Sequence, residues 1–170
     1  NNSKTTWKDP KRYLWLLSPA VPVIGIAALS AYAVAPKRLR ALAWVGPALV
    51  HGVIPAIDRL IGEDKSNPPV SAVQQLENDK YYGRIVKAFI PAQYAVTFLG
   101  AWLASRKNTP MIDRVGLTFS VGAINGIAIN TAHELGHKHD KTERLLAMLA
   151  LAPTGYTHFA VEHNFGHHKR

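Results

Sequence analysis

Cysteine is absent from this sequence of 170 residues, and its absence excludes several kinds of chemistry. Without a thiol, the chain forms no disulfide, binds no metal through thiolate and uses no cysteine nucleophile. Any metal site in this chain therefore uses other ligands.

Charged residues are missing from four long runs, residues 13–36, 41–57, 88–105 and 115–133. Each run approaches the about 20 residues that a helix needs to cross a bilayer. Four buried helices of a soluble protein are the alternative, but these should show a polar face, and the runs are apolar all round. The sequence predicts an all-α fold: a polytopic transmembrane helix bundle with four spanning helices, in one membrane-embedded domain over residues 1–170.

Proline, aromatic and turn-forming residues refine this prediction. Pro19, Pro22, Pro47 and Pro91 should kink the helices that contain them, which neighbouring helices make tolerable in lipid. Trp7, Trp15, Tyr81, Tyr82 and Trp102 fall near predicted helix ends, where aromatic anchors occur. Residues 62–80 are polar and turn-rich, which is typical of a loop. Residues 144–151 resemble a short helix, interfacial or buried against the bundle, before a break at Pro153, Thr154 and Gly155 and a new helix that carries His163, His167 and His168.

The distribution of Lys and Arg predicts the orientation of the bundle. With the N-terminus in the cytoplasm, fourteen of the 20 basic residues fall on the cytoplasmic side. The short segment at residues 36–40 opposes this assignment. The positive-inside rule nevertheless favours an orientation that puts residues 133–138 at the cytoplasmic end of the fourth helix.

The formal net charge of +9 bears on the partners of the chain. Its basic residues form clusters beside the predicted helices and no continuous stripe with interleaved aromatics. This pattern favours anionic lipid headgroups over nucleic acid.

Five histidines near the end of the chain predict a metal centre. His133 and His137 are four residues apart, as are His163 and His167, so within a helix each pair can converge on one ion. His168 is turned by about 100° from His167, so a second ion nearby is more natural than a single one.

Other interpretations of these histidines exist. The segment HELGH also matches the pattern of zinc proteases, in which Glu134 would be the general base. The second histidine group exceeds what one zinc needs, and this argues against the protease. A non-catalytic bundle that stores or transports metal is a third hypothesis. Single histidines in apolar helices are usually hydrogen-bonded core residues, and His51 fits this case, while His139 is typical of a solvated loop.

The segment HELGHK, followed by LALAPTGYTHFAVEHNFGHH, resembles the integral-membrane alkane 1-monooxygenases, which belong to the histidine-box membrane hydroxylases and desaturases. The resemblance runs from the first predicted helix to Arg170. It implies that His133, His137, His163, His167 and His168 are iron ligands. The family also has an isolated histidine and a further HxxHH box, which this chain lacks, so we expect an N-terminal part of a longer enzyme, incomplete at the C-terminus.

The resemblance implies a non-haem di-iron centre that uses O₂ to convert the terminal methyl of a medium-chain alkane to a primary alcohol. Electrons would come from NADH through rubredoxin reductase and rubredoxin. The implied location is the bacterial inner membrane, with the metal site toward the cytoplasm and the alkane arriving from the bilayer. The positive cytoplasmic face would attract an acidic rubredoxin.

Two further groups of residues are predicted around this centre. Glu134 and Glu162 are each next to a predicted ligand and would orient the imidazole of that ligand. His158 would donate a hydrogen bond to the groups that surround the ligands, or would pack between helices. Surface charge pairing is the alternative for the two carboxylates.

Residues below His133 on its helix face are expected to border a substrate tunnel. These are Gly126, Ile129 and Asn130, which lie seven, four and three residues earlier. Tight helix packing at Gly122 and Gly126 is the alternative.

Overall fold

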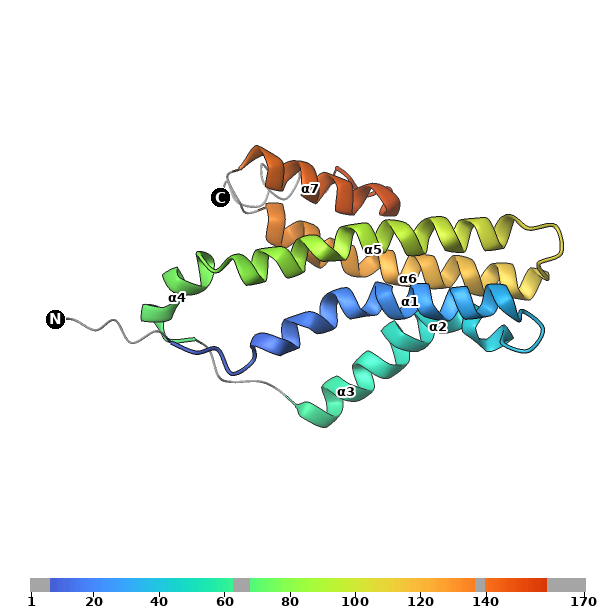
Figure 1. Cartoon of the computed structure of the whole chain (residues 1–170), viewed down its shortest axis with the longest axis horizontal. Helices are drawn as coiled ribbons and strands as arrows, with labels where there is room; N and C mark the ends of the chain where they lie inside the picture. The colour runs from blue at the N-terminus through green and yellow to red at the C-terminus, as the bar shows by residue number, and fades with distance from the viewer. Residues whose placement is uncertain (1–6, 63–67, 137–139, 159–170) are drawn as a thin grey trace.

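The computed structural model describes residues 7–62, 68–136 and 140–158, and within these ranges every regular element is helical (Figure 1). The elements in chain order are η1 Arg12–Leu16, α1 Leu17–Val34, η2 Arg40–Trp44, α2 Val45–Pro47, η3 Ala48–Val53, α3 Ile54–Ile61, α4 Val70–Glu77, α5 Lys80–Ser105, α6 Met111–Gly136, α7 Lys141–Leu151 and η4 Ala152–Thr154.

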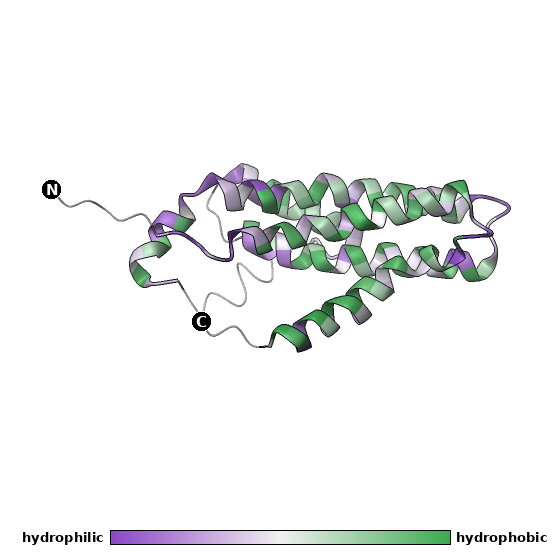
Figure 2. Cartoon of the chain, turned by 60° about the horizontal axis from the view of Figure 1, so that its bottom comes forward, coloured by the Kyte–Doolittle hydropathy of each residue, from purple (hydrophilic) through white to green (hydrophobic). Residues whose placement is uncertain are grey.

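Four helical stretches are long and apolar enough to cross a bilayer: Arg12–Val34, Arg40–Ile61, Lys80–Ser105 and Met111–Gly136. They contain three of the four charge-free runs whole and residues 13–34 of the first, which confirms the predicted all-α bundle with four spanning helices. The helices extend beyond the runs because Lys and Arg near helix ends keep their charge at the polar boundary while their stems lie along the helix. Hydrophilic residues gather toward the two ends of the bundle, and hydrophobic residues lie between them (Figure 2).

The first, third and fourth spans form the core of the bundle. α5 packs against both α1 and α6 (Figure 1). Their contact, with residues of the turn η2, buries one cluster of side chains, which comprises Leu29, Tyr32, Ala43, Val96, Leu103, Leu117 and Ile124. This cluster holds the three helices side by side and fixes the position of α6.

The second span is broken where it leaves the core. η2 and α2 pack against α6, Pro47 precedes the π-helical turn η3, and α3 diverges from the bundle (Figure 1). A π turn carries an extra residue and commonly changes the direction of a helix. All residues from 51 to 62 are exposed, so the second half of this span leaves one side of α6 open.

The other prolines that were predicted to kink helices lie in more regular surroundings. Pro22 lies inside α1 and Pro91 inside α5, each of which continues past its proline. Pro19 lies in the first turn of α1, where the backbone N–H that proline lacks has no partner in the helix.

α7 re-enters the bundle beside α5 and α6. Lys87 pairs with Glu143 at 2.6 Å near the start of α7, and Gln93 donates to the carbonyl of Ala150 at 2.9 Å near its end. α7 therefore runs parallel to α5, and its 11 residues reach about 16 Å back along the bundle. The inner face of α7 packs against α5 and α6 in a second buried cluster. This cluster comprises Phe89, Ile90, Ala128, Ala132, Leu135, Ala147, Ala150 and Leu151.

The two ends of α7 are capped by side chains. At the start, the Asp140 carboxylate accepts the backbone N–H of Thr142 at 2.6 Å, and this hydrogen bond lowers the pKa of Asp140 below its ordinary value. At the end, the hydroxyl of Tyr94 donates to the carbonyl of Leu149 at 2.9 Å, beside the bond from Gln93. Terminal carbonyls of a helix need such partners in an apolar surrounding. The predicted short helix before a break is therefore present, packed against the bundle, and Gly155 follows it in the left-handed conformation.

The N-terminal segment is attached to the start of α5. Arg12 pairs with Asp79 at 2.6 Å and stacks on the ring of Tyr81, while the hydroxyl of Tyr82 donates to Asp9 at 2.6 Å. Residues 62–80, predicted as a loop, contain the helix α4, whose Gln75 exchanges two hydrogen bonds with the backbone of Trp7. These contacts place the N-terminal segment, α4 and the start of α5 at one end of the bundle (Figure 1).

Candidate functional site

α6 carries His133 in its last turn, at the end of the bundle where α7 begins (Figure 1). The side chains of His133 and Glu134 are both exposed, while their neighbours Ala132 and Leu135 are buried against α7. The C-terminal end of a helix carries partial negative charge, which favours a cation. An imidazole and a carboxylate at this end therefore form a suitable part of a metal site.

The other predicted ligands, His137, His163, His167 and His168, lie outside the described residues, as do Glu162 and the helix predicted to carry the second histidine group. Among the residues that the structure does describe, no three histidine or carboxylate side chains gather in a group able to hold a metal ion. Of the five predicted metal ligands, only His133 belongs to the described part of the chain. Its ligand type fits a transition metal such as iron, for which imidazole is a common ligand.

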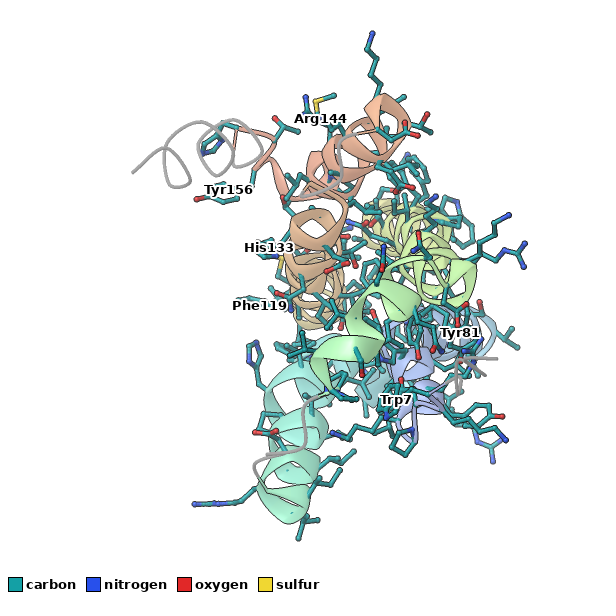
Figure 3. All side chains as sticks on the ribbon, turned by 90° about the vertical axis from the view of Figure 1, so that its left-hand side faces the viewer. Trp7, Tyr81, Phe119, His133, Arg144 and Tyr156 are labelled. Atoms are coloured by element: carbon teal, nitrogen blue, oxygen red, sulfur yellow. The ribbon has the colours of Figure 1, made fainter. Side chains whose placement is uncertain are left out.

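His158 is the last described residue, and it follows the turn at Gly155. Its side chain is exposed, and its ring meets that of Tyr156 edge to face, with the centroids 4.4 Å apart. Figure 3 shows Tyr156 on the same side of the molecule as His133 and Phe119. The turn after α7 therefore brings the chain back to the side of α6 that bears His133.

A groove lies on this side of α6, between α6 and the broken second span. Its volume is about 670 Å³, within the range of small-molecule sites. Apolar side chains dominate its lining, which consists of Pro47, Val50, His51, Thr118, Phe119, Gly122, Ala123, Gly126, Ile127 and Asn130.

The groove points toward His133. Phe119, Gly126 and His133 are seven residues apart, and a helix drifts by only about 20° over seven residues, so they lie nearly on one line along α6. Phe119 and His133 project on the same side in Figure 3. A molecule that lies in the groove is therefore aligned with the candidate metal ligand.

Two of the three residues predicted for a tunnel, Gly126 and Asn130, line this groove. Ile129 does not, because it packs against the cluster around α7. Among the described residues, Gly122 and Gly126 make no tight helix contact, since both are exposed and a Cβ at either would meet nothing within 4 Å.

His51 also differs from its predicted surroundings. It was expected to be a hydrogen-bonded core residue, but it is exposed on the wall of the groove within the π turn η3. Sequence reasoning missed it because a lone histidine in an apolar segment carries no spacing signal. The residues Thr118, Gly122, Gly126 and Asn130 did carry one, since they follow one another at intervals of four along one face of α6.

Comparison with known proteins gives close relatives. The chain is 54% identical over 163 residues to an alkane 1-monooxygenase of Acinetobacter baylyi, covering 95% of this chain and 40% of the relative. It is 42% identical to alkane 1-monooxygenase 1 of Alcanivorax borkumensis (95% and 39%) and 38% identical to the alkane 1-monooxygenase of Pseudomonas putida (99% and 41%). No protein-family model matches the chain.

The chain spans about two fifths of the length of these relatives, in agreement with the expectation that it is part of a longer protein. Together with the four spanning helices, the relationship identifies it as a multi-pass membrane protein.

Proposed function

Since the chain is a homologue of the alkane 1-monooxygenases over about two fifths of their length, we propose that it supplies part of a membrane-bound alkane hydroxylase. The reaction is R–CH₃ + O₂ + 2e⁻ + 2H⁺ → R–CH₂OH + H₂O, with a medium-chain n-alkane as the substrate. One oxygen atom enters the terminal C–H bond, and the other is reduced to water. The observation that carries the proposal is an apolar groove aligned with His133, inside a bundle whose helices suit a bilayer.

The apolar lining of the groove suits an alkane that enters from the bilayer. An alkane dissolves in the hydrocarbon of the bilayer and can enter an apolar groove between spanning helices without crossing water. The lining of Phe119, Gly122 and Gly126 offers a contact surface without charge. Alignment of that surface with His133 presents one end of a linear molecule to the candidate ligand and orients the terminal carbon.

The proposed centre holds two iron ions, with His133, His137, His163, His167 and His168 as ligands in this chain and the remaining ligands outside it. When bound, the iron pair supplies the activation of O₂. Glu134 and Glu162 orient ligand imidazoles by accepting their free N–H groups. The exposed position of Glu134 beside His133 is compatible with this role.

Electrons are proposed to come from NADH through rubredoxin reductase and rubredoxin. The site then lies toward the cytoplasm in a bacterial inner membrane, where a soluble donor can reach it. Lys141 and Arg144, near the end of the bundle that bears His133, give this face basic residues that would attract an acidic donor.

Replacement of His168 with alanine in the full-length polypeptide should abolish both iron binding and alkane oxidation. Two irons per polypeptide are expected in the unmodified enzyme, because both histidine groups would be engaged. Metal analysis and 1-alkanol formation from an n-alkane with a supplied electron donor are the measurements. His139→Ala is the matched control, as His139 is predicted to be a loop residue, and it should keep iron and activity.

The same assay separates the zinc-protease alternative, which predicts one zinc, an essential Glu134 and a dispensable His168. Retention of iron and activity in His168→Ala would contradict the di-iron proposal. Labile metal that exchanges freely, without any oxidation of alkanes, would indicate the storage or transport bundle.

Replacement of Gly126 with leucine should shorten the longest alkane that is oxidised. A Cβ at this position meets nothing within 4 Å, and the rest of a leucine side chain would occupy part of the groove. Product chain lengths from a mixture of n-alkanes are the measurement. Gly83→Ala is the control, since Gly83 is also unobstructed but lies outside the groove. An unchanged chain-length profile in a folded, iron-loaded Gly126→Leu enzyme would exclude the groove as the alkane path.

A further inference from the structure

We propose that His51 and Asn130 form a hydroxyl-binding site in the groove, and that its ligand is a primary alkanol. The inference rests on the proposed function, because the alkanol is the product of that reaction. It extends the function by assigning two polar residues that neither metal binding nor the apolar path explains.

His51 and Asn130 are polar side chains on an otherwise largely apolar wall. Each belongs to a stretch long and apolar enough to span a bilayer. Within the described part of the chain, neither side chain makes a hydrogen bond or an ion pair. Both side chains are exposed to the groove, and polar groups without a partner are costly in an apolar surrounding, so a ligand that supplies hydrogen bonds there is stabilised.

The register of the two helices puts the two residues at neighbouring levels. Gly46 donates its backbone N–H to the hydroxyl of Ser120 at 3.0 Å, which aligns the second span with α6. Both helices run in the same direction from this point (Figure 1). His51 is five residues beyond Gly46 and Asn130 is ten beyond Ser120, so the difference in level is about 7.5 Å along the axis. Side chains of this length can approach a shared ligand from opposite walls.

The chemistry of the two groups selects a neutral hydroxyl. A neutral imidazole offers one donor and one acceptor, and the amide of Asn130 offers both kinds as well. A hydroxyl also donates and accepts, so it can satisfy both residues. An alkane satisfies neither. A carboxylate would bring a charge that no Lys or Arg lines the groove to neutralise.

Asn130 lies one helical turn below His133, about 4.5 Å along α6. An alkanol formed at the candidate metal centre therefore meets Asn130 first and His51 deeper in the groove. The side of α6 that faces α3 is open, and the residues of α3 are exposed. The two polar groups would thus hold the hydroxyl while the product leaves along the groove toward lipid.

The test uses the full-length, iron-loaded protein in lipid nanodiscs and two photoreactive probes. One is a 1-alkanol with a mid-chain diazirine, and the other is the corresponding alkane without the hydroxyl. Mass spectrometry locates the labelled residues, and 1-dodecanol competes for the alkanol probe. The variants are His51→Phe and Asn130→Leu. Ser30→Ala is the control, because Ser30 is exposed on α1 outside the groove.

Each variant should raise the concentration of 1-dodecanol needed for half-competition by about fivefold to tenfold, the loss expected for one hydrogen bond. Labelling by the alkane probe should not decrease, and the iron content should stay at that of the unmodified protein in His51→Phe. Ser30→Ala should match the unmodified protein with both probes.

An equal loss of labelling by both probes would overturn the proposal, because shape and not the hydroxyl would then decide binding. Absence of label in the groove would also overturn it, and would point to lipid or another part of the polypeptide in that space. If alkane oxidation is normal but the alkanol probe shows no selectivity, the hydroxyl-binding site is contradicted and the proposed function stands. Selective alkanol binding without any oxidation supports the site and contradicts the function.

Discussion

Replacement of Gly46 with alanine is expected to separate the second span from α6 and to destabilise the full-length protein by about 2–4 kcal/mol. A Cβ at Gly46 would lie 2.4 Å from both Cα and the carbonyl oxygen of Ser120. These are backbone atoms of a buried helix, so no rotation of a side chain can relieve the overlap. Separation of the helices would also stretch the hydrogen bond from the Gly46 N–H to Ser120, whose hydroxyl donates in turn to the carbonyl of Ala43 at 2.7 Å.

Unfolding of the purified protein in mixed micelles with increasing SDS would measure this effect. Gly52→Ala is the matched control, because Gly52 lies in the same span and a Cβ there meets nothing within 4 Å. Alanine is intrinsically the better helix former, so the control should be neutral or slightly stabilising. Equal stability of Gly46→Ala and Gly52→Ala would mean that the contact with Ser120 does not hold the second span.

The close contact at Gly46 also bears on the groove. The second span touches α6 around Gly46 and Ser120, and then diverges after the π turn, which opens the space beside Gly122 and Gly126. A small residue where the helices meet and a break beyond it therefore produce the groove together. A shift at Gly46 should change the shape of the groove, and the chain-length profile of any active variant should change with it.

The four spans were predictable because the absence of charge over about twenty residues is a strong physical signal. The residues at which the spanning helices begin and end were less predictable. α6 begins at Met111 and not at Val115, and it includes Asp113 and Arg114, the two charged residues before the charge-free run; Asp113 is buried and paired with Arg40. α5 likewise begins at Lys80 and not at Ala88. A charge count does not distinguish a solvated carboxylate from one that has found partners.

The candidate site was predictable only where residues repeat at helical spacing. Gly126 and Asn130 were identified from their register with His133, and both line the groove. Ile129 shares that register but packs against the cluster that α5, α6 and α7 form, which the spacing does not reveal. His51 was misjudged because its position depends on the π turn after Pro47, a tertiary effect of the contact with α6. The clustering of the five histidines stays a prediction.

Replacement of Asp113 with leucine should be the other strongly destabilising change, by about 2–4 kcal/mol. The carboxylate is 2% exposed and accepts hydrogen bonds from the hydroxyl of Tyr32 and the Nε of Arg40, each at 3.0 Å. It thus joins α1, η2 and α6 at the end of the bundle away from His133. Leucine fills a similar volume but leaves the Tyr32 hydroxyl without its acceptor in a buried place. Arg40 is half exposed, so its guanidinium can turn to water, which places the expected loss below that of a fully buried ion pair.

Asp113→Asn separates the contribution of the negative charge to stability from that of the side-chain shape and its hydrogen bond. Its amide oxygen can still accept from Tyr32, whereas the ionic contribution of Arg40 is lost, so about half of the effect of leucine is expected. Asp58→Asn is the control, because Asp58 lies on exposed α3 without a side-chain partner in the described part of the chain. Unfolding in SDS and the yield of monodisperse protein are the measurements. If leucine and asparagine prove equally harmless, the three-way contact contributes nothing and the helices are held at that end by apolar packing alone.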